Sequence, residues 1–164
     1  MTITIFIVLV SAGLPSMTAW INSNQMKSSA SSLTTLLRAA RSEALTRNNT
    51  VTLASNAGGG DWTSNIRMYM DTAGGNSPFD ASEGDEAIST ADLRTSTVTI
   101  NGSAAATTYI SFSGDGRLDE GGATVSIEVC RGRGANVDTT DGQTIDINIV
   151  GRVSVSDGVT DCTP

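Results

Sequence analysis

Few residues of this chain are of types that take part in catalysis or metal binding, and histidine, the most versatile of these types, is absent. The sequence has no histidine and only two cysteines, Cys130 and Cys162. Without histidine the chain lacks the commonest general base and the commonest metal ligand, and Ser-His and Cys-His catalytic arrangements are excluded. No motif for carboxylate-pair or Ser-Lys chemistry is present either. We therefore predict that the protein is not an enzyme and uses no cofactor.

The two cysteines allow two interpretations. They are too few for a zinc site without histidine, and they do not form a C-x-x-C redox motif. The simpler interpretation is a disulfide between Cys130 and Cys162 that ties the C-terminal tail to a strand end in an oxidising compartment. The alternative is a pair of buried free thiols.

Acidic residues exceed basic ones, with 17 Asp and Glu against 10 Lys and Arg and a formal net charge of −7. Such a surface repels phosphate groups and disfavours nucleic-acid binding. The longest irregular stretch, Asp71–Ala87, is rich in the oxygen ligands that calcium prefers. It lacks the alternating acidic pattern of an EF-hand loop, so we predict an acidic surface loop and no metal. The calcium candidates are Asp71, Asp80, Glu83, Asp85 and Glu86.

One long helix is predicted over residues 1–48. From Met26 onward its apolar residues recur at alternating spacings of four and three, which is typical of one packed helix face. These residues are Met26, Ala30, Leu33, Leu37, Ala40 and Ala44. Pro15 lies inside the helix and predicts a kink or a loosened turn. The alternative is a helix that begins only after Pro15.

After Asn49 the hydrophobic period changes to two, which predicts strands. Gly-rich and Asp-rich turns separate the segments, and their short spacing indicates antiparallel pairing. The fold class is therefore α+β, with a long N-terminal helix laid across an antiparallel β-sheet. The predicted strands are residues 50–55, 66–70, 96–101, 108–112, 124–130, 144–150 and 152–156.

The first residues are the most apolar of the chain. No basic residue precedes them, as a cleavable signal peptide would require, and the helical pattern continues beyond them. The segment from Met1 to Leu14 gives a helix of roughly 21 Å, which is shorter than the roughly 30 Å hydrocarbon layer of a membrane. About seven further residues upstream would complete a span. The residues concerned are Ile3, Ile5, Phe6, Ile7, Val8, Leu9, Val10 and Leu14, followed by Pro15.

The order of these segments resembles the GspH/FimT family of type II secretion pseudopilins and minor type IV pilins. "TITIFIVLVSAGLPS" (residues 2–16) is similar to the family's N-terminal helix, whose apolar half ends with a proline. "LTTLLRAARSEALTRNNTVTL" (Leu33–Leu53) resembles the family's passage from helix to first strand. "ISFSGDGRL" (Ile110–Leu118) and "VGRVSVS" with a final cysteine resemble its strand-turn segment and its C-terminal end. The leader, the cleaved Gly, the methylated Phe and the early Glu of the family are absent, so we expect that about seven mature residues precede Met1.

The resemblance implies a pilin-like fold and a structural role. Residues 1–21 would be the half of the helix that serves as membrane anchor and filament core, and residues 22–164 the periplasmic or extracellular domain. The expected partners are other pilin subunits and the inner-membrane assembly platform. The helix face from Met26 to Ala44 would pack on the domain and on neighbouring subunits. Which machine uses the subunit, and whether it is a major or a minor component, stays open, although the resemblance favours a minor one.

DNA capture is the alternative function that the resemblance implies. Some FimT-type pilins have a G-R-x-R-x-R motif near the C-terminus, where this chain has "GRVSVS". Arg152 is kept, whereas Ser154 and Ser156 stand where the other arginines would be. Arg131 and Arg133 could rebuild a basic patch with Arg152, but the net charge disfavours this function.

Overall fold

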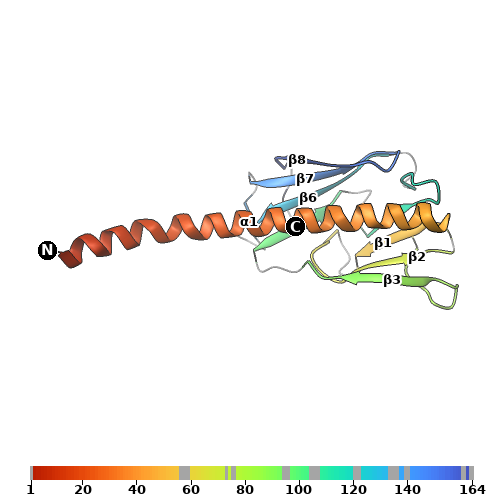
Figure 1. Ribbon diagram of the computed structural model, residues 1–164, viewed down its shortest axis with the longest axis horizontal. Helices are drawn as coiled ribbons and strands as arrows, with labels where there is room; N and C mark the ends of the chain where they lie inside the picture. Colours follow the sequence, from red (N-terminus) through yellow and green to blue (C-terminus); the bar gives the residue numbers. More distant parts are fainter. Residues whose placement is uncertain are drawn as a thin grey trace.

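The computed structural model describes residues 2–55, 60–72, 74, 77–93, 97–103, 108–119, 123–132, 137–138, 141–159 and 162, and the side chains of the helix from Met17 onward. Helix α1 (Thr2–Arg47) is followed by eight strands, and its N-terminal part extends away from the β-strands (Figure 1). The strands are β1 (Val51–Ser55), β2 (Ile66–Met70), β3 (Glu86–Ala91), β4 (Val98–Gly102), β5 (Tyr109–Phe112), β6 (Val125–Arg131), β7 (Gly142–Ile147) and β8 (Val153–Asp157).

The α+β class and the antiparallel pairing are confirmed, but the strands form two sheets instead of one. The first sheet has the order β3-β2-β1-β5 and the second the order β4-β6-β7-β8. Every described strand pair is antiparallel. Helix α1 contacts strands of both sheets and thereby closes a single core.

The predicted helix is one continuous element that passes through Pro15, so the alternative of a helix that begins after Pro15 is wrong. Its end follows from the sequence. Asn48 has φ 50°, a left-handed conformation that asparagine tolerates, and the amide of Asn49 donates to the carbonyl of Ala44 at 3.3 Å. This is the hydrogen bond of a Schellman C-cap.

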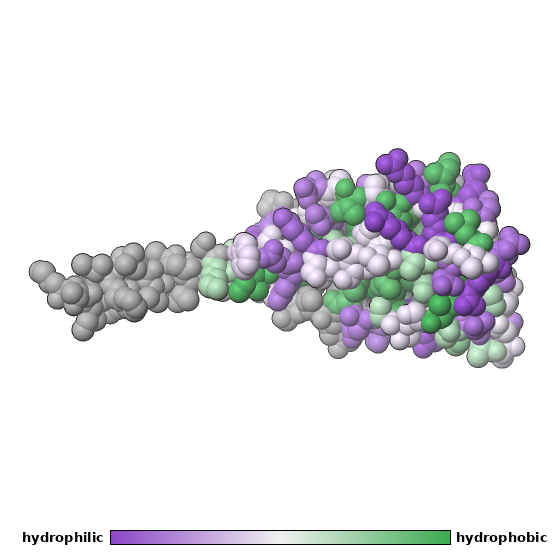
Figure 2. Space-filling model, viewed as in Figure 1, coloured by the Kyte–Doolittle hydropathy of each residue, from purple (hydrophilic) through white to green (hydrophobic). Residues whose placement is uncertain are grey.

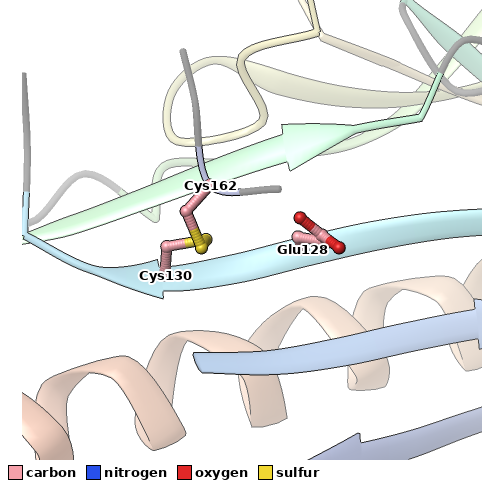
Figure 3. A group of neighbouring side chains, drawn as sticks. All are labelled: Glu128, Cys130 and Cys162. Carbon is pink, nitrogen blue, oxygen red and sulfur yellow. A yellow bond between two sulfur atoms is a disulfide. The ribbon is translucent and has the colours of Figure 1, made fainter. Parts of the chain in front are cut away.

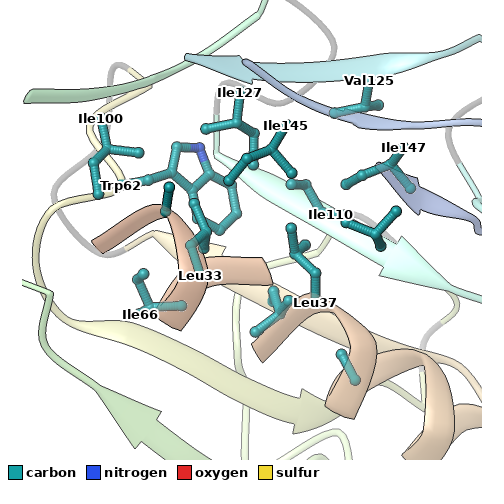
Figure 4. Packing of buried hydrophobic residues seen from close by; sticks show 14 of the residues in the cluster. Leu33, Leu37, Trp62, Ile66, Ile100, Ile110, Val125, Ile127, Ile145 and Ile147 are labelled. Atoms are coloured by element: carbon teal, nitrogen blue, oxygen red, sulfur yellow. The ribbon is translucent and has the colours of Figure 1, made fainter. Parts of the chain in front are cut away.

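The core lies where α1 crosses the two sheets (Figure 4). All six residues of the predicted helix face are at most 1% exposed. Leu33 and Leu37 meet the indole of Trp62 and the isoleucines of the sheets. The expectation that this face also packs on neighbouring subunits is therefore wrong, because its own domain already covers it completely.

The ends of two predicted segments, one loop and one strand, need correction. The predicted loop 71–87 ends two residues earlier, at Asp85, because β3 begins at Glu86. No hydrophobic pattern marks β3 in the sequence, because it is an edge strand whose six residues are all exposed or half-exposed. The strand predicted over 144–150 ends at Ile147, and residues 149–150 form the turn that leads into β8.

Candidate functional site

The predicted disulfide is present (Figure 3). Cys130 on β6 and Cys162 near the C-terminus are bonded, with 5.9 Å between their Cα atoms, and both are fully buried. The alternative of two free thiols is therefore wrong. The carboxylate of Glu128 lies within 4.8 Å of both sulfur atoms. Because a metal needs thiolate ligands, the bonded sulfurs do not make this group a metal site.

Two of the three arginines of the candidate basic patch, Arg131 and Arg152, are not brought together. Arg131 is at the end of β6 that pairs with Gly142, whereas Arg152 precedes β8 at the opposite end of the sheet, where Val125, Ile147 and Val153 are paired. Arg131 also forms ion pairs with Asp138 and Asp141. These carboxylates, above all Asp138, raise the pKa of Arg131. Their negative charges offset the positive charge of its guanidinium. Arg133 lies outside the described residues.

The acidic residues of the β2–β3 connection accept hydrogen bonds from the loop itself. Asp71 is 1% exposed and accepts from Ser77 Oγ at 2.9 Å and from the Gly74 amide at 3.1 Å. Asp85 accepts from the amides of Thr72 at 3.0 Å and Asp80 at 2.9 Å. Asp80, Glu83 and Glu86 are exposed. Among the described residues, the ligand oxygens of the five calcium candidates are not gathered into one cluster.

Acid is expected to loosen this loop through Asp85. Burial acts to raise the pKa of Asp85, but the hydrogen bonds from Asp80 and Thr72 outweigh it and lower the pKa. A carboxylate with a lowered folded pKa contributes stability that is complete above its unfolded pKa of about 4 and is lost as the pH falls through the folded value. We expect Asp85→Asn to be less stable at pH 7 and to show a shallower loss of stability below about pH 4.

Urea unfolding at a series of pH values measures this effect. Glu83→Gln is the matched control, because Glu83 is exposed and its backbone carbonyl, which the substitution keeps, is what accepts the hydrogen bond from Thr72. Equal acid dependence of the Asp85→Asn variant and the original protein would contradict the assignment.

The apolar residues predicted to form the membrane and filament helix, Ile3 to Pro15, lie outside the described side chains. Next to them, three large apolar side chains of α1 are exposed: Met17 at 62%, Trp20 at 66% and Ile21 at 39%. Figure 2 shows hydrophobic atoms on the helix beside its grey part. Within the part of α1 whose side chains are described, no segment has both the length and the apolar character of a membrane span.

A further site, not predicted from the sequence, lies at the C-terminal end of α1. Arg41 donates from Nε to the carbonyl of Gly116 and from Nη2 to the carbonyl of Val150, both at 2.9 Å. Gly116 belongs to the turn after β5 in the first sheet, and Val150 to the turn between β7 and β8 in the second. Arg41 therefore fastens the helix to both sheets. We call Arg41 and these two turns the Arg41 junction.

Glycines bring the chain segments of the Arg41 junction into contact. Gly151 has φ +74°, and a Cβ there would lie 2.1 Å from the Gly116 carbonyl oxygen. A Cβ on Gly116 would touch Leu45 of α1 at 2.9 Å. A Cβ on Gly114 would lie 2.6 Å from the backbone of Asn48. Only glycine permits these approaches without a shift of the neighbouring atoms.

Comparison with known proteins supports a family assignment. The family model described as "Type II transport protein GspH" matches residues 29–151. The chain belongs to the GspH family. The match includes the Arg41 junction and every strand except β8. No curated protein matched the chain.

The fold of this GspH-family chain is shared with a type IV minor pilin. Two crystal structures of FimU from Pseudomonas aeruginosa, strain PAO1, match with TM-scores of 0.64 and 0.65. The sequence identities are 19% and 20%, and the matches cover 85% and 84% of this chain and 96% and 99% of the FimU chains. At this identity the comparison establishes the pilin-like fold.

The GspH-family motifs quoted from the sequence meet in space. "ARSEA" supplies Arg41, "SGDGRL" supplies Gly114 and Gly116, and "VGR" supplies Val150 and Gly151. Their residues hold turns together and form no catalytic arrangement. The family is one of structural subunits, and the motifs serve folding in this chain.

Proposed function

We propose that this chain is a minor pilin or pseudopilin that is anchored in the bacterial inner membrane through residues 1–21 and then assembled into a type IV pilus or a type II secretion pseudopilus. Residues 22–164 form the domain that faces the periplasm or the exterior. Other pilin subunits are the partners in the filament, and an inner-membrane platform assembles them. Family membership supports the structural role.

One observation carries the assembly proposal. Met17, Trp20 and Ile21 are exposed on the part of α1 that precedes the domain core, which begins at Met26. Contiguous exposed apolar side chains mark contacts with a membrane or with other proteins. Tryptophan is also enriched at membrane–water interfaces, where Trp20 would lie before assembly.

The proposal predicts that Trp20→Asp disrupts assembly without unfolding the domain. A charge at this position opposes both lipid and helix–helix contact, because a buried unpaired carboxylate is costly. We expect at least about a tenfold decrease of the subunit in sheared filaments, which corresponds to 1.4 kcal/mol or more, with an unchanged thermal midpoint. Immunoblots of filament and membrane fractions measure the distribution.

The matched control is Asn24→Asp, which introduces the same charge at an exposed position of the same helix. Normal filament incorporation of the Trp20→Asp variant would contradict the proposal. Equal losses in both variants would point to a general charge effect and would also count against it.

The DNA-capture alternative has less support. Arg131 is neutralised by Asp138 and Asp141, and the formal net charge is −7. A salt-dependent gel shift at low ionic strength tests this function, and no shift would eliminate it.

A further inference from the structure

A basic groove runs along α1 on the side of β7 and β8. Two hollows of about 330 and 360 Å³ adjoin at Arg38, which lines both. Arg41 and Arg152 line the first hollow, and Lys27 lines the second. The groove thus gathers four of the ten basic residues of an acidic chain, and none of the acidic residues that the structure describes lines either hollow.

The cations of this groove have no counter-ions in the described part of the chain. The ion pairs found there involve Arg47 and Arg131, but none of the four groove cations. Arg41 donates to two backbone carbonyls, which carry no formal charge. Four uncompensated cations in one groove create a positive potential that attracts carboxylates or phosphates.

The hydroxyl of Thr34 is an independent observation that points to a ligand in the groove. It lines the groove beside Lys27 and Arg38 and is only 5% exposed, and its Oγ1 has no hydrogen-bond partner. Buried side-chain hydroxyls nearly always have a partner. A threonine on a helix has two favourable χ1 rotamers, because its hydroxyl can bond a carbonyl of the preceding turn; a ligand in the groove offers the Thr34 hydroxyl another acceptor.

The rest of the lining favours a peptide over a nucleic acid. Leu45 and Val155 are 50% and 42% exposed and supply apolar contact area beside the cations. No aromatic side chain, on which bases would stack, lines either hollow. Val155 belongs to β8, the edge strand of its sheet, so an extended segment has space to lie along it.

We propose that the groove binds an extended peptide segment, rich in acidic and aliphatic residues, from a neighbouring filament subunit. The proposal rests on the proposed function, because that function supplies the neighbour. The carboxylates of the segment contact Lys27, Arg38 and Arg152, and its aliphatic side chains contact Val155 and Leu45. The hydroxyl of Thr34 donates a hydrogen bond to a carboxylate or backbone carbonyl of the segment.

A labelled peptide with the sequence of residues 79–91, FDASEGDEAISTA, is a suitable probe, because it combines four carboxylates with aliphatic side chains. Its binding to the full chain in detergent micelles is measured by fluorescence anisotropy at low ionic strength. We expect saturable binding that weakens about tenfold in the Arg38→Ala variant. Arg47→Ala is the matched control, with the same charge removed from the same helix outside the groove, and it should bind nearly as the original protein does.

The Thr34→Val variant tests whether the hydroxyl of Thr34 serves peptide binding or the stability of the fold. Its unpaired hydroxyl contributes no hydrogen bond to the fold, so the variant should be at least as stable as the original protein and yet bind the peptide several-fold more weakly. Unchanged binding in both Arg38→Ala and Thr34→Val would overturn the proposal.

Two further outcomes would also overturn it. One is equal binding of a peptide in which all four carboxylates are amides. The other is tighter binding of a short DNA duplex that Arg38→Ala abolishes, which would assign the groove to nucleic acid. Normal filament incorporation of a chain that fails to bind the peptide would reject the groove proposal alone, whereas the Trp20→Asp experiment tests the proposed function separately.

Discussion

Replacing Gly151 with alanine is expected to destabilise the domain by about 3–5 kcal/mol, the range reached when backbone strain and a steric clash act together. The φ of +74° alone costs an alanine about 1–2 kcal/mol. The added methyl group would also lie 2.1 Å from the Gly116 carbonyl oxygen and 2.9 Å from Arg41 Nε. The turns must therefore separate, and the hydrogen bonds of Arg41 are lost.

The variant Gly158→Ala is a control that separates the cost of a positive φ from the cost of a steric clash. Gly158 has φ +105°, but no atom lies within 4 Å of the place of its Cβ. This control should show only the conformational cost of about 1–2 kcal/mol. Urea unfolding of both variants measures the difference, and equal destabilisation would show that the close approach in the Arg41 junction has no energetic weight.

Removal of the disulfide is the second large effect expected. The bond joins residues 32 positions apart, and chain entropy predicts a loss of about 3–4 kcal/mol when it is absent. The Cys130→Ala, Cys162→Ala double variant should therefore unfold at a markedly lower urea concentration. Cys130 lies on β6, which is paired on both sides, so the bridge fixes the C-terminal tail to an interior strand.

Reductant provides the control for this prediction. It should lower the unfolding midpoint of the original protein and leave that of the double variant unchanged. An original protein whose stability is the same with and without reductant would contradict the proposed contribution of the bridge.

The features set by local pattern were predictable from the sequence. The buried helix face has a clear period, so all six of its residues were identified correctly. The disulfide followed from the presence of only two cysteines and the absence of histidine. Strands with one buried side, such as β6, show the alternation that burial imposes.

The features set by distant contacts were not predictable in this way. Strand β3 has mostly exposed side chains and therefore no alternating pattern. The division into two sheets depends on which strands pair across long sequence separations, as β1 does with β5. The roles of Arg41 and Gly151 arise only when segments more than 100 positions apart meet, as the Arg41 bond to Val150 shows. Thr34 likewise looks like an ordinary helical threonine until its lack of a partner is seen in the fold.

The path of α1 has a mechanical consequence. Its buried face runs from Met26 to Ala44 along both sheets, and Arg41 fastens it near the far end. A pull on the protruding N-terminal part acts along the helix axis and loads these contacts in parallel, as in shear, whereas a sideways pull would peel them apart one by one. Forced unfolding is governed by the unfolding rate, so a subunit built in this way should resist tension along a filament better than its modest core would suggest.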